Sequence, residues 1–231
     1  MRIIAICPLM LAGAFGLAWA ACAQPVPTAP ENPAATADAP PWLAWHTQTF
    51  FGPCDSDCGF ALYGGREITT PMSSVFLIHN PVPPWSVQTG NAGVVAAALS
   101  RSFATLFGLV DVEAEVGFDQ RFGDMHATTG WLAAVFRWSR FPWNNLVTTT
   151  IAIADGPSFA SQIDTAERLR SGNGRGSDFL NVASPEMTFA LPGHPEDELV
   201  LRYQHRSGMF GLINGVDEGS SFATIGFRRV F

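Results

Sequence analysis

Long apolar runs are missing from most of this chain. After residue 23, no stretch approaches the roughly 18 uninterrupted apolar residues that a membrane-spanning helix needs, which excludes a helical membrane protein. Charge is scarce too: charged residues make up 14% of the 231 residues, whereas about a quarter of a soluble domain is charged. Aromatic residues, in contrast, make up 12%. We therefore predict that something other than water faces part of the protein surface.

Positive charge is also in short supply. The formal net charge is −7, so the chain lacks the basic footprint with which proteins bind nucleic acid or anionic membrane surfaces. We expect no nucleic-acid partner.

Cysteine is rare after residue 23, where Cys54 and Cys58 are the two that remain. In an oxidising envelope compartment, cysteines at such a short separation favour a local disulfide bond. The alternative is a metal site that combines both thiolates with the carboxylates of Asp55 and Asp57. No second ligand pair at a finger-like spacing supports that alternative, so we assign no metal.

The chain divides into three parts by composition. Residues 1–23 are typical of a secretory signal peptide, with a charge at Arg2, an apolar stretch and small residues before Gln24. Residues 24–41 are rich in Pro and Ala and predict an extended linker. Residues 42–231 are expected to form the folded domain. The signal predicts a mature protein outside the cytoplasm.

Strict alternation of apolar and polar residues runs from Val110 to Phe122 and places all the acidic residues of this segment on one face of a strand. In a soluble sandwich these acids would face water. In a membrane barrel they would face the interior, and the apolar residues would face lipid. The alternation alone does not choose between the two.

The spacing of such segments favours the barrel. Similar segments occupy residues 93–107, 110–122, 127–141, 145–158, 178–191, 197–208 and 220–231, with one more between Gly59 and His79. Short connections alternate with long ones, as in outer-membrane barrels. We therefore predict an all-β fold, an antiparallel up-and-down transmembrane β-barrel of about eight strands. Its inward acids Asp111, Glu113 and Glu115 are expected to pair with Arg137, Arg202 and Arg206.

The last 33 residues, Leu199–Phe231, carry the candidate chemistry. In a strand, His205 and Ser207 point the same way as Leu199, Leu201 and Tyr203, which predicts the outer face. An imidazole and a hydroxyl on neighbouring positions of one face allow general-base activation of a nucleophile. If the chain ends on the periplasmic side, His205 lies roughly 20 Å above Leu199, near the outer leaflet.

The segment Tyr203–Ser207, the Gly-rich loop that follows and the aromatic carboxy-terminal residue resemble the end of the PagL-type lipid A deacylases, which are acyloxyacyl-hydrolase-like outer-membrane barrels. The resemblance implies Ser207 as nucleophile, His205 as base, and Asp217 as the acid, with Glu218 as the alternative acid. It also implies an oxyanion site at the Asn214 side chain or at an amide near Gly208. Gly208 stands where the family has Asn.

The resulting hypothesis is an outer-membrane serine esterase that removes an ester-linked acyl chain from lipid A, with lipopolysaccharide of the outer leaflet as its partner. The proposed chemistry requires no metal and no organic cofactor. A catalytically silent barrel, whose long loops such as Ala160–Ser177 contact other envelope components, is the alternative. A homodimer is left open, and no role is expected for His46, His79, His126 or His194.

Overall fold

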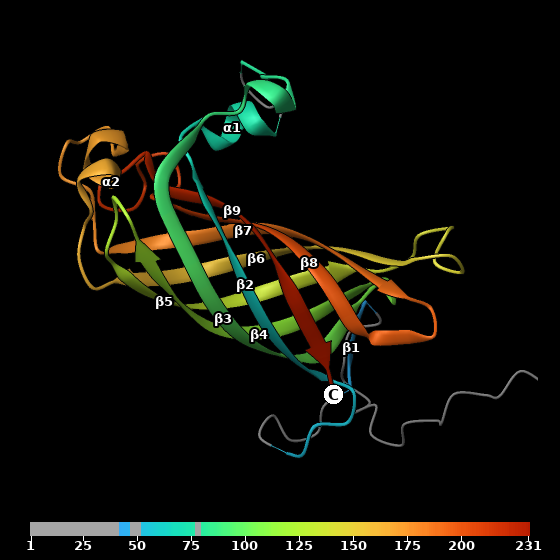
Figure 1. Cartoon of the computed structure of the whole chain (residues 1–231). Coiled ribbons are helices and arrows are strands. Elements are labelled where there is room, and N and C mark those ends of the chain that lie inside the picture. Colours follow the sequence, from blue (N-terminus) through green and yellow to red (C-terminus); the bar gives the residue numbers. More distant parts are fainter. Residues whose placement is uncertain (1–41, 47–51, 77–79) are drawn as a thin grey trace, which may run out of the picture. The chain divides into compact units, whose positions relative to one another are not determined.

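The computed structural model describes residues 42–46, 52–76 and 80–231 (Figure 1). The predicted signal peptide and linker, and His79, lie outside the described residues. Within the described ranges, no helix combines the length and the apolar character needed to cross a membrane.

Most of the described chain is β-strand. The elements are β1 (Leu43–Trp45), β2 (Cys58–Ile68), α1 (Met72–Val75), η1 (Pro84–Ser86), β3 (Thr89–Leu106), β4 (Val110–Phe122), β5 (Thr128–Trp138), β6 (Thr148–Ala160), α2 (Thr165–Arg170), β7 (Phe179–Leu191), β8 (His194–Ser207) and β9 (Glu218–Val230). Each strand from β2 to β9 pairs antiparallel with the next, and β9 pairs with β2. The fold is a closed antiparallel barrel of eight strands, as the sequence predicted.

The short strand β1 lies outside this closed circuit. It pairs with the end of β3, with Leu43 opposite Leu106 and Trp45 opposite Ala104. Strand β2 begins only opposite Arg101, so β1 covers the edge of β3 that β2 leaves unpaired. Covering an edge in this way removes a template for pairing with other chains.

The polarity of the barrel decides between the two readings of the alternating pattern. On β4, Glu113, Glu115 and Asp119 are buried, whereas Val116 and Phe118 are 50% and 59% exposed. Other strands follow the same rule, with exposed residues that include Phe60, Leu62, Leu99, Leu132, Ile153, Leu199, Leu201, Ile225 and Phe227. The charges therefore face the interior and the apolar side chains face outward, which is the polarity of a membrane barrel.

Buried ion pairs fill the middle of the barrel. Arg137 donates to Glu113 at 2.6 Å and to Glu186 at 2.9 Å, and Arg202 donates to Glu115 at 2.7 Å. These pairs confirm the predicted partners of the two glutamates. Because the charges pair with one another across strands, the pairing offsets part of the cost of burying them.

Two of the expected interior pairings differ from the structure. Asp111 is only partly buried and accepts a hydrogen bond from Thr105 at 3.0 Å; within the described ranges it forms no ion pair with an arginine. Arg206 pairs instead with Glu167 of α2, at 2.7 Å. Arg228 contributes further, unpredicted pairs with Glu113 and Glu198 at 3.1 and 2.8 Å.

The two ends of the barrel differ in their connections. At the end near the carboxy-terminus, the connections cover residues 107–109, 139–147 and 192–193; at the other end, they include 69–88, 161–178 and 208–217 and carry α1 and α2 (Figure 1). Aromatic rings gather at the first end, where Phe141 packs on Trp138 and Trp143 at centroid distances of 4.5 and 4.8 Å. This is the predicted asymmetry of short and long connections.

Candidate functional site

The candidate residues lie on the outer face of the barrel, at the end with the long connections. On β8, Leu199 and Leu201 face outward, and His205 continues the same parity. The β8–β9 register places Ser221 directly opposite His205. The two side chains meet there: the His205 Nδ1 atom lies 2.9 Å from the Ser221 Oγ atom. A histidine and a serine are thus hydrogen-bonded on the outer face.

His205 is covered rather than open to the surroundings. It is 5% exposed, because the Tyr203 ring stacks beside it at a centroid distance of 6.2 Å. Phe76, which follows α1, packs edge-on against Tyr203 at 5.2 Å. His205 continues the outward parity of β8, but its side chain is covered by Tyr203 and Phe76 and is not open on the outer face.

Ser207 lies two residues further along β8 and is half-buried. Its Oγ atom accepts a long, 3.5 Å hydrogen bond from the Met209 backbone N–H. A register shift separates His205 from Ser207, so Ser207 lies opposite Glu218 on β9. In the described part of the chain, His205 makes its side-chain hydrogen bond to Ser221 and none to Ser207.

The two candidate acids make their contacts with groups other than the imidazole. Asp217 is exposed, its backbone N–H donates to the Ser171 carbonyl at 3.0 Å, and its carboxylate packs against Gly172 at the end of α2. Glu218 is half-buried between Arg170 and the backbone N–H of Met72. Among the described residues, neither carboxylate hydrogen-bonds to His205.

The two oxyanion candidates hold the long loops together. The Asn214 side-chain amide donates to the Ser177 Oγ atom at 2.8 Å and to the Phe179 carbonyl at 3.2 Å. A Cβ atom on Gly208 would lie 2.1 Å from the Val216 carbonyl oxygen. The β8–β9 loop therefore packs onto Gly208 so closely that the asparagine of the PagL-type pattern has no room here.

An apolar groove adjoins the candidate site on the outer face. Its volume is about 570 Å³, and its lining residues include Phe76, Ile151, Pro185, Met187, Leu201, Tyr203 and Ala223. Tyr203 belongs both to this groove and to the cover of His205. An apolar chain in the groove would therefore end next to the histidine.

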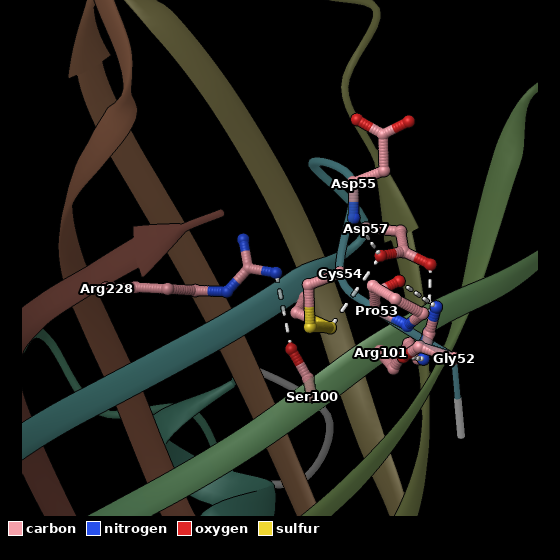
Figure 2. The surroundings of a disulfide bond; sticks show 9 residues. Gly52, Pro53, Cys54, Asp55, Asp57, Ser100, Arg101 and Arg228 are labelled. Carbon is pink, nitrogen blue, oxygen red and sulfur yellow. Dashed lines mark hydrogen bonds and ion pairs between the residues drawn. A yellow bond between two sulfur atoms is a disulfide. The ribbon is translucent and has the colours of Figure 1, made fainter. Parts of the chain in front are cut away.

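The two cysteines form a disulfide bond, with a Cα–Cα distance of 5.5 Å (Figure 2). Their thiolates are therefore not available to bind a metal. Arg101 on β3 ties the adjoining segment down by donating to Asp57 at 2.9 Å and to the carbonyl of Gly52 at 2.6 Å. Burial raises the pKa of Asp57, but the Asp55 backbone N–H and the Arg101 guanidinium outweigh it and lower that pKa below its usual range.

Comparison with known proteins gives few matches. No protein-family model and no curated protein sequence matches the chain. Among solved structures, the crystal structure of the outer membrane enzyme PagL is similar, with a TM-score of 0.46 and 11% sequence identity. The match covers 75% of this chain and 99% of that chain.

Sequence reasoning missed three residues of the site, namely Ser221, Tyr203 as a cover for His205, and Phe76. Ser221 has a signal in hindsight, because Ala223, Ile225 and Phe227 alternate outward and Ser221 continues their parity. Phe76 has no comparable signal, since it lies in a connection without alternation.

Proposed function

We propose that this protein is an outer-membrane barrel that hydrolyses an ester-linked acyl chain of lipid A. The observation that carries the proposal is the placement of His205 on β8, two residues from Ser207 and beside Tyr203, whose ring also lines an apolar groove on the outer face. An imidazole near a serine hydroxyl can act as the general base that activates the hydroxyl as a nucleophile in acyl transfer. The substrate class is chosen because the reacting groups face the side on which lipid would lie.

The location is supported by the polarity of the barrel. Charged side chains pair inside it, whereas large apolar side chains such as Phe118 and Leu132 are 59% and 60% exposed. Such an apolar surface is costly in water and favourable in a bilayer. The rings of Trp138, Phe141 and Trp143 at the end with short connections fit an interfacial aromatic girdle.

We expect His205 and Ser207 to have the roles that the PagL-type pattern implies. His205 removes the proton from Ser207, whose Oγ atom attacks the ester carbonyl carbon, and water then hydrolyses the acyl-enzyme. The acyl chain would lie in the groove beside Tyr203. No side-chain oxyanion donor is assigned, because Asn214 is engaged by Ser177 and Phe179.

The decisive experiment compares lipid A masses from cells of a Gram-negative host with normal lipid A. The cells express wild type, Ser207→Ala or Ser220→Ala; Ser220 is a buried neighbour on β9 whose hydroxyl bonds to no described residue. We expect lipid A to lose one hydroxyacyl chain with wild type and Ser220→Ala, and to stay intact with Ser207→Ala. Intact lipid A in the presence of a correctly inserted wild-type barrel would refute the esterase.

A catalytically silent structural or surface-interaction barrel is the second candidate. One observation favours it: the imidazole of His205 bonds to Ser221 and not to the proposed nucleophile. This candidate predicts a heat-modifiable outer-membrane protein, whose gel mobility shifts on boiling, with identical lipid A masses in all three strains. A protein that fractionates as soluble and shows no mobility shift would contradict both candidates.

A further inference from the structure

The candidate site has a histidine and serines but no carboxylate on the imidazole. We propose that Ser221 is the positioning residue of the site and takes the place that an acid holds in a serine–histidine–acid triad. The inference rests on the proposed function, in which His205 is the base and Ser207 the nucleophile. It names a third residue for that site that the PagL-type pattern does not contain.

The geometry gives Ser221 this place. Ser221 lies directly across from His205 in the β8–β9 register, and its Oγ atom is 2.9 Å from Nδ1. Both side chains are 5% exposed, so water competes little for this bond. The Tyr203 ring, stacked at an interplanar angle of 29°, restrains the plane of the imidazole. A rigid strand pair thus holds the hydroxyl against one nitrogen of the ring.

The nearby carboxylates contact groups other than the imidazole. Asp217 packs against Gly172, and Glu218 lies with Arg170 and the Met72 backbone N–H. The β8–β9 register places Glu218 opposite Ser207, while Ser221 holds the position opposite His205. Ser221 is the described side chain that remains in hydrogen-bonding contact with the imidazole.

A serine hydroxyl can accept or donate a hydrogen bond, and the proposal takes the Ser221 Oγ atom as the acceptor from Nδ1–H. A neutral histidine carries its proton on one nitrogen, and the partner of that nitrogen selects the tautomer. With the Ser221 Oγ atom as acceptor, Nδ1 keeps its proton and Nε2 presents a lone pair. Nε2 then takes the Ser207 proton as Oγ bonds to the carbonyl carbon, and returns it to the leaving alcohol oxygen when the ester C–O bond breaks.

A serine orients the ring but supplies no negative charge. The imidazolium that forms during the reaction is therefore stabilised less than it would be beside a carboxylate. The site is expected to retain the correct tautomer and to turn over more slowly than a triad with an acid. This distinguishes a positioning residue from a catalytic group, because Ser221 acts through His205 and does not touch the ester.

The test uses the full-length barrel, folded in detergent micelles with purified lipid A. The variants are Ser221→Ala, Ser221→Thr and the matched control Ser220→Ala. A single hydrogen bond of about 1.4 kcal/mol corresponds to a factor of ten in rate. We expect Ser221→Ala to lower the turnover rate by about tenfold to a hundredfold, Ser221→Thr to stay within about threefold, and Ser220→Ala to match wild type.

Two further readouts separate positioning from the other roles. The ¹⁵N chemical shifts of His205 should report a protonated Nδ1 in wild type and a loss of this preference in Ser221→Ala. A fluorophosphonate probe should modify Ser207, as located by fragmentation of the peptide Ser207–Arg228. Modification of Ser221 would instead make it the nucleophile and overturn the positioning role.

Other outcomes of these experiments also test the positioning role of Ser221. Equal rates for Ser221→Ala and Ser220→Ala would overturn the inference. It would also be overturned if Glu218→Gln abolished the activity while Ser221→Ala retained it. If wild type leaves lipid A intact, the proposed function fails on its own. The ¹⁵N shifts still test the His205–Ser221 bond in that case, and a protonated Nε2 in wild type would overturn the inference.

Discussion

Glu167 and Arg206 form a buried ion pair at the mouth of the barrel, where Arg206 Nη1 donates to Glu167 Oε1 at 2.7 Å. Glu167 belongs to α2 in the long β6–β7 connection, and Arg206 belongs to β8. The other carboxylate oxygen accepts a hydrogen bond from Arg121 of β4 at 3.3 Å. One loop residue therefore links two strands across the mouth and fixes the loop to the barrel.

Glu167→Ala should destabilise the barrel by about 3–5 kcal/mol, because it leaves two buried guanidinium groups without their shared carboxylate. The free energy of unfolding by urea, measured in detergent, checks this. Arg168→Ala is the control, since it removes a charge from the same helix at an exposed position and should change that free energy by less than about 0.5 kcal/mol. Equal effects of the two variants would contradict an anchored loop.

Arg202→Leu, in the middle of the barrel, should destabilise the fold about as much as Glu167→Ala does. The Arg202 side chain is 1% exposed and pairs with Glu115 at 2.7 Å and with Glu186 at 3.3 Å. Removing it leaves two buried carboxylates partly unpaired, at a cost of about 3–5 kcal/mol. The control Arg229→Leu removes the partner of Asp197 at a position that is 55% exposed, where an ion pair contributes less than about 1 kcal/mol. The fraction of heat-modifiable protein after refolding measures the loss of stability in each of the two variants.

Leu132→Arg tests the membrane location. Leu132 lies on β5 and is 60% exposed on the outer face. In a bilayer the new charge should cost about 2–4 kcal/mol of folding free energy, whereas on a water-exposed face it should cost almost nothing. Leu212→Arg in the β8–β9 loop, at a position that is 82% exposed, is the matched control. Folding into lipid vesicles with no difference between the two variants would argue against a lipid-facing β5.

Asp57→Asn should affect stability in a way that depends on pH. The pKa of Asp57 is lowered in the folded protein, so its ionised form contributes stability above the unfolded pKa of about 3.9. That contribution is lost as the pH falls through the folded pKa. The stability difference between wild type and Asp57→Asn should therefore be present at pH 7 and vanish in acid. A difference that grows as the pH falls would contradict the Arg101 pairing.

Much of the barrel could be predicted from the sequence, because its strands alternate strictly. The pattern from Val110 to Phe122 gave the bounds of β4, and it placed Glu113 and Glu115 inside with Arg137 and Arg202. Strand β2 was hard to place, since Gly64 and Gly65 interrupt its alternation. Period-two patterning reports which face a residue occupies, but it does not report the partner across the barrel, so the pairings of Asp111, Arg206 and Arg228 did not follow from it.

The details of the site depend on features without such a period. The register shift between His205 and Ser207, which brings Glu218 opposite Ser207, is a local irregularity, and no alternation in the sequence marks it. The cover by Phe76 and the inward turn of Glu167 come from long connections, whose path is set by tertiary contacts. For these reasons the alternation predicts the strand parity of His205 and Ser207 but does not reveal Ser221 as the partner of the imidazole.

Gly208 is the position where the chain departs from the PagL-type pattern, and the structure supplies a steric reason. A Cβ atom there would meet the carbonyl oxygens of Val216 and Ile213 at 2.1 and 2.6 Å. Gly208→Ala and Gly208→Asn should therefore push the β8–β9 loop away, at a cost of about 1–3 kcal/mol. Gly193→Ala is the control, because a Cβ atom there meets nothing within 4 Å.

The displaced loop should be cleaved faster by chymotrypsin at Phe210, which is 95% exposed in the native loop. If the esterase is active, Gly208→Asn should lower its rate, because the loop that begins next to Ser207 moves. A faster enzyme with the asparagine of the PagL-type pattern would mean that the loop adapts and that glycine is what limits the activity. Unchanged cleavage in both Gly208 variants would show that the loop tolerates a side chain at this position.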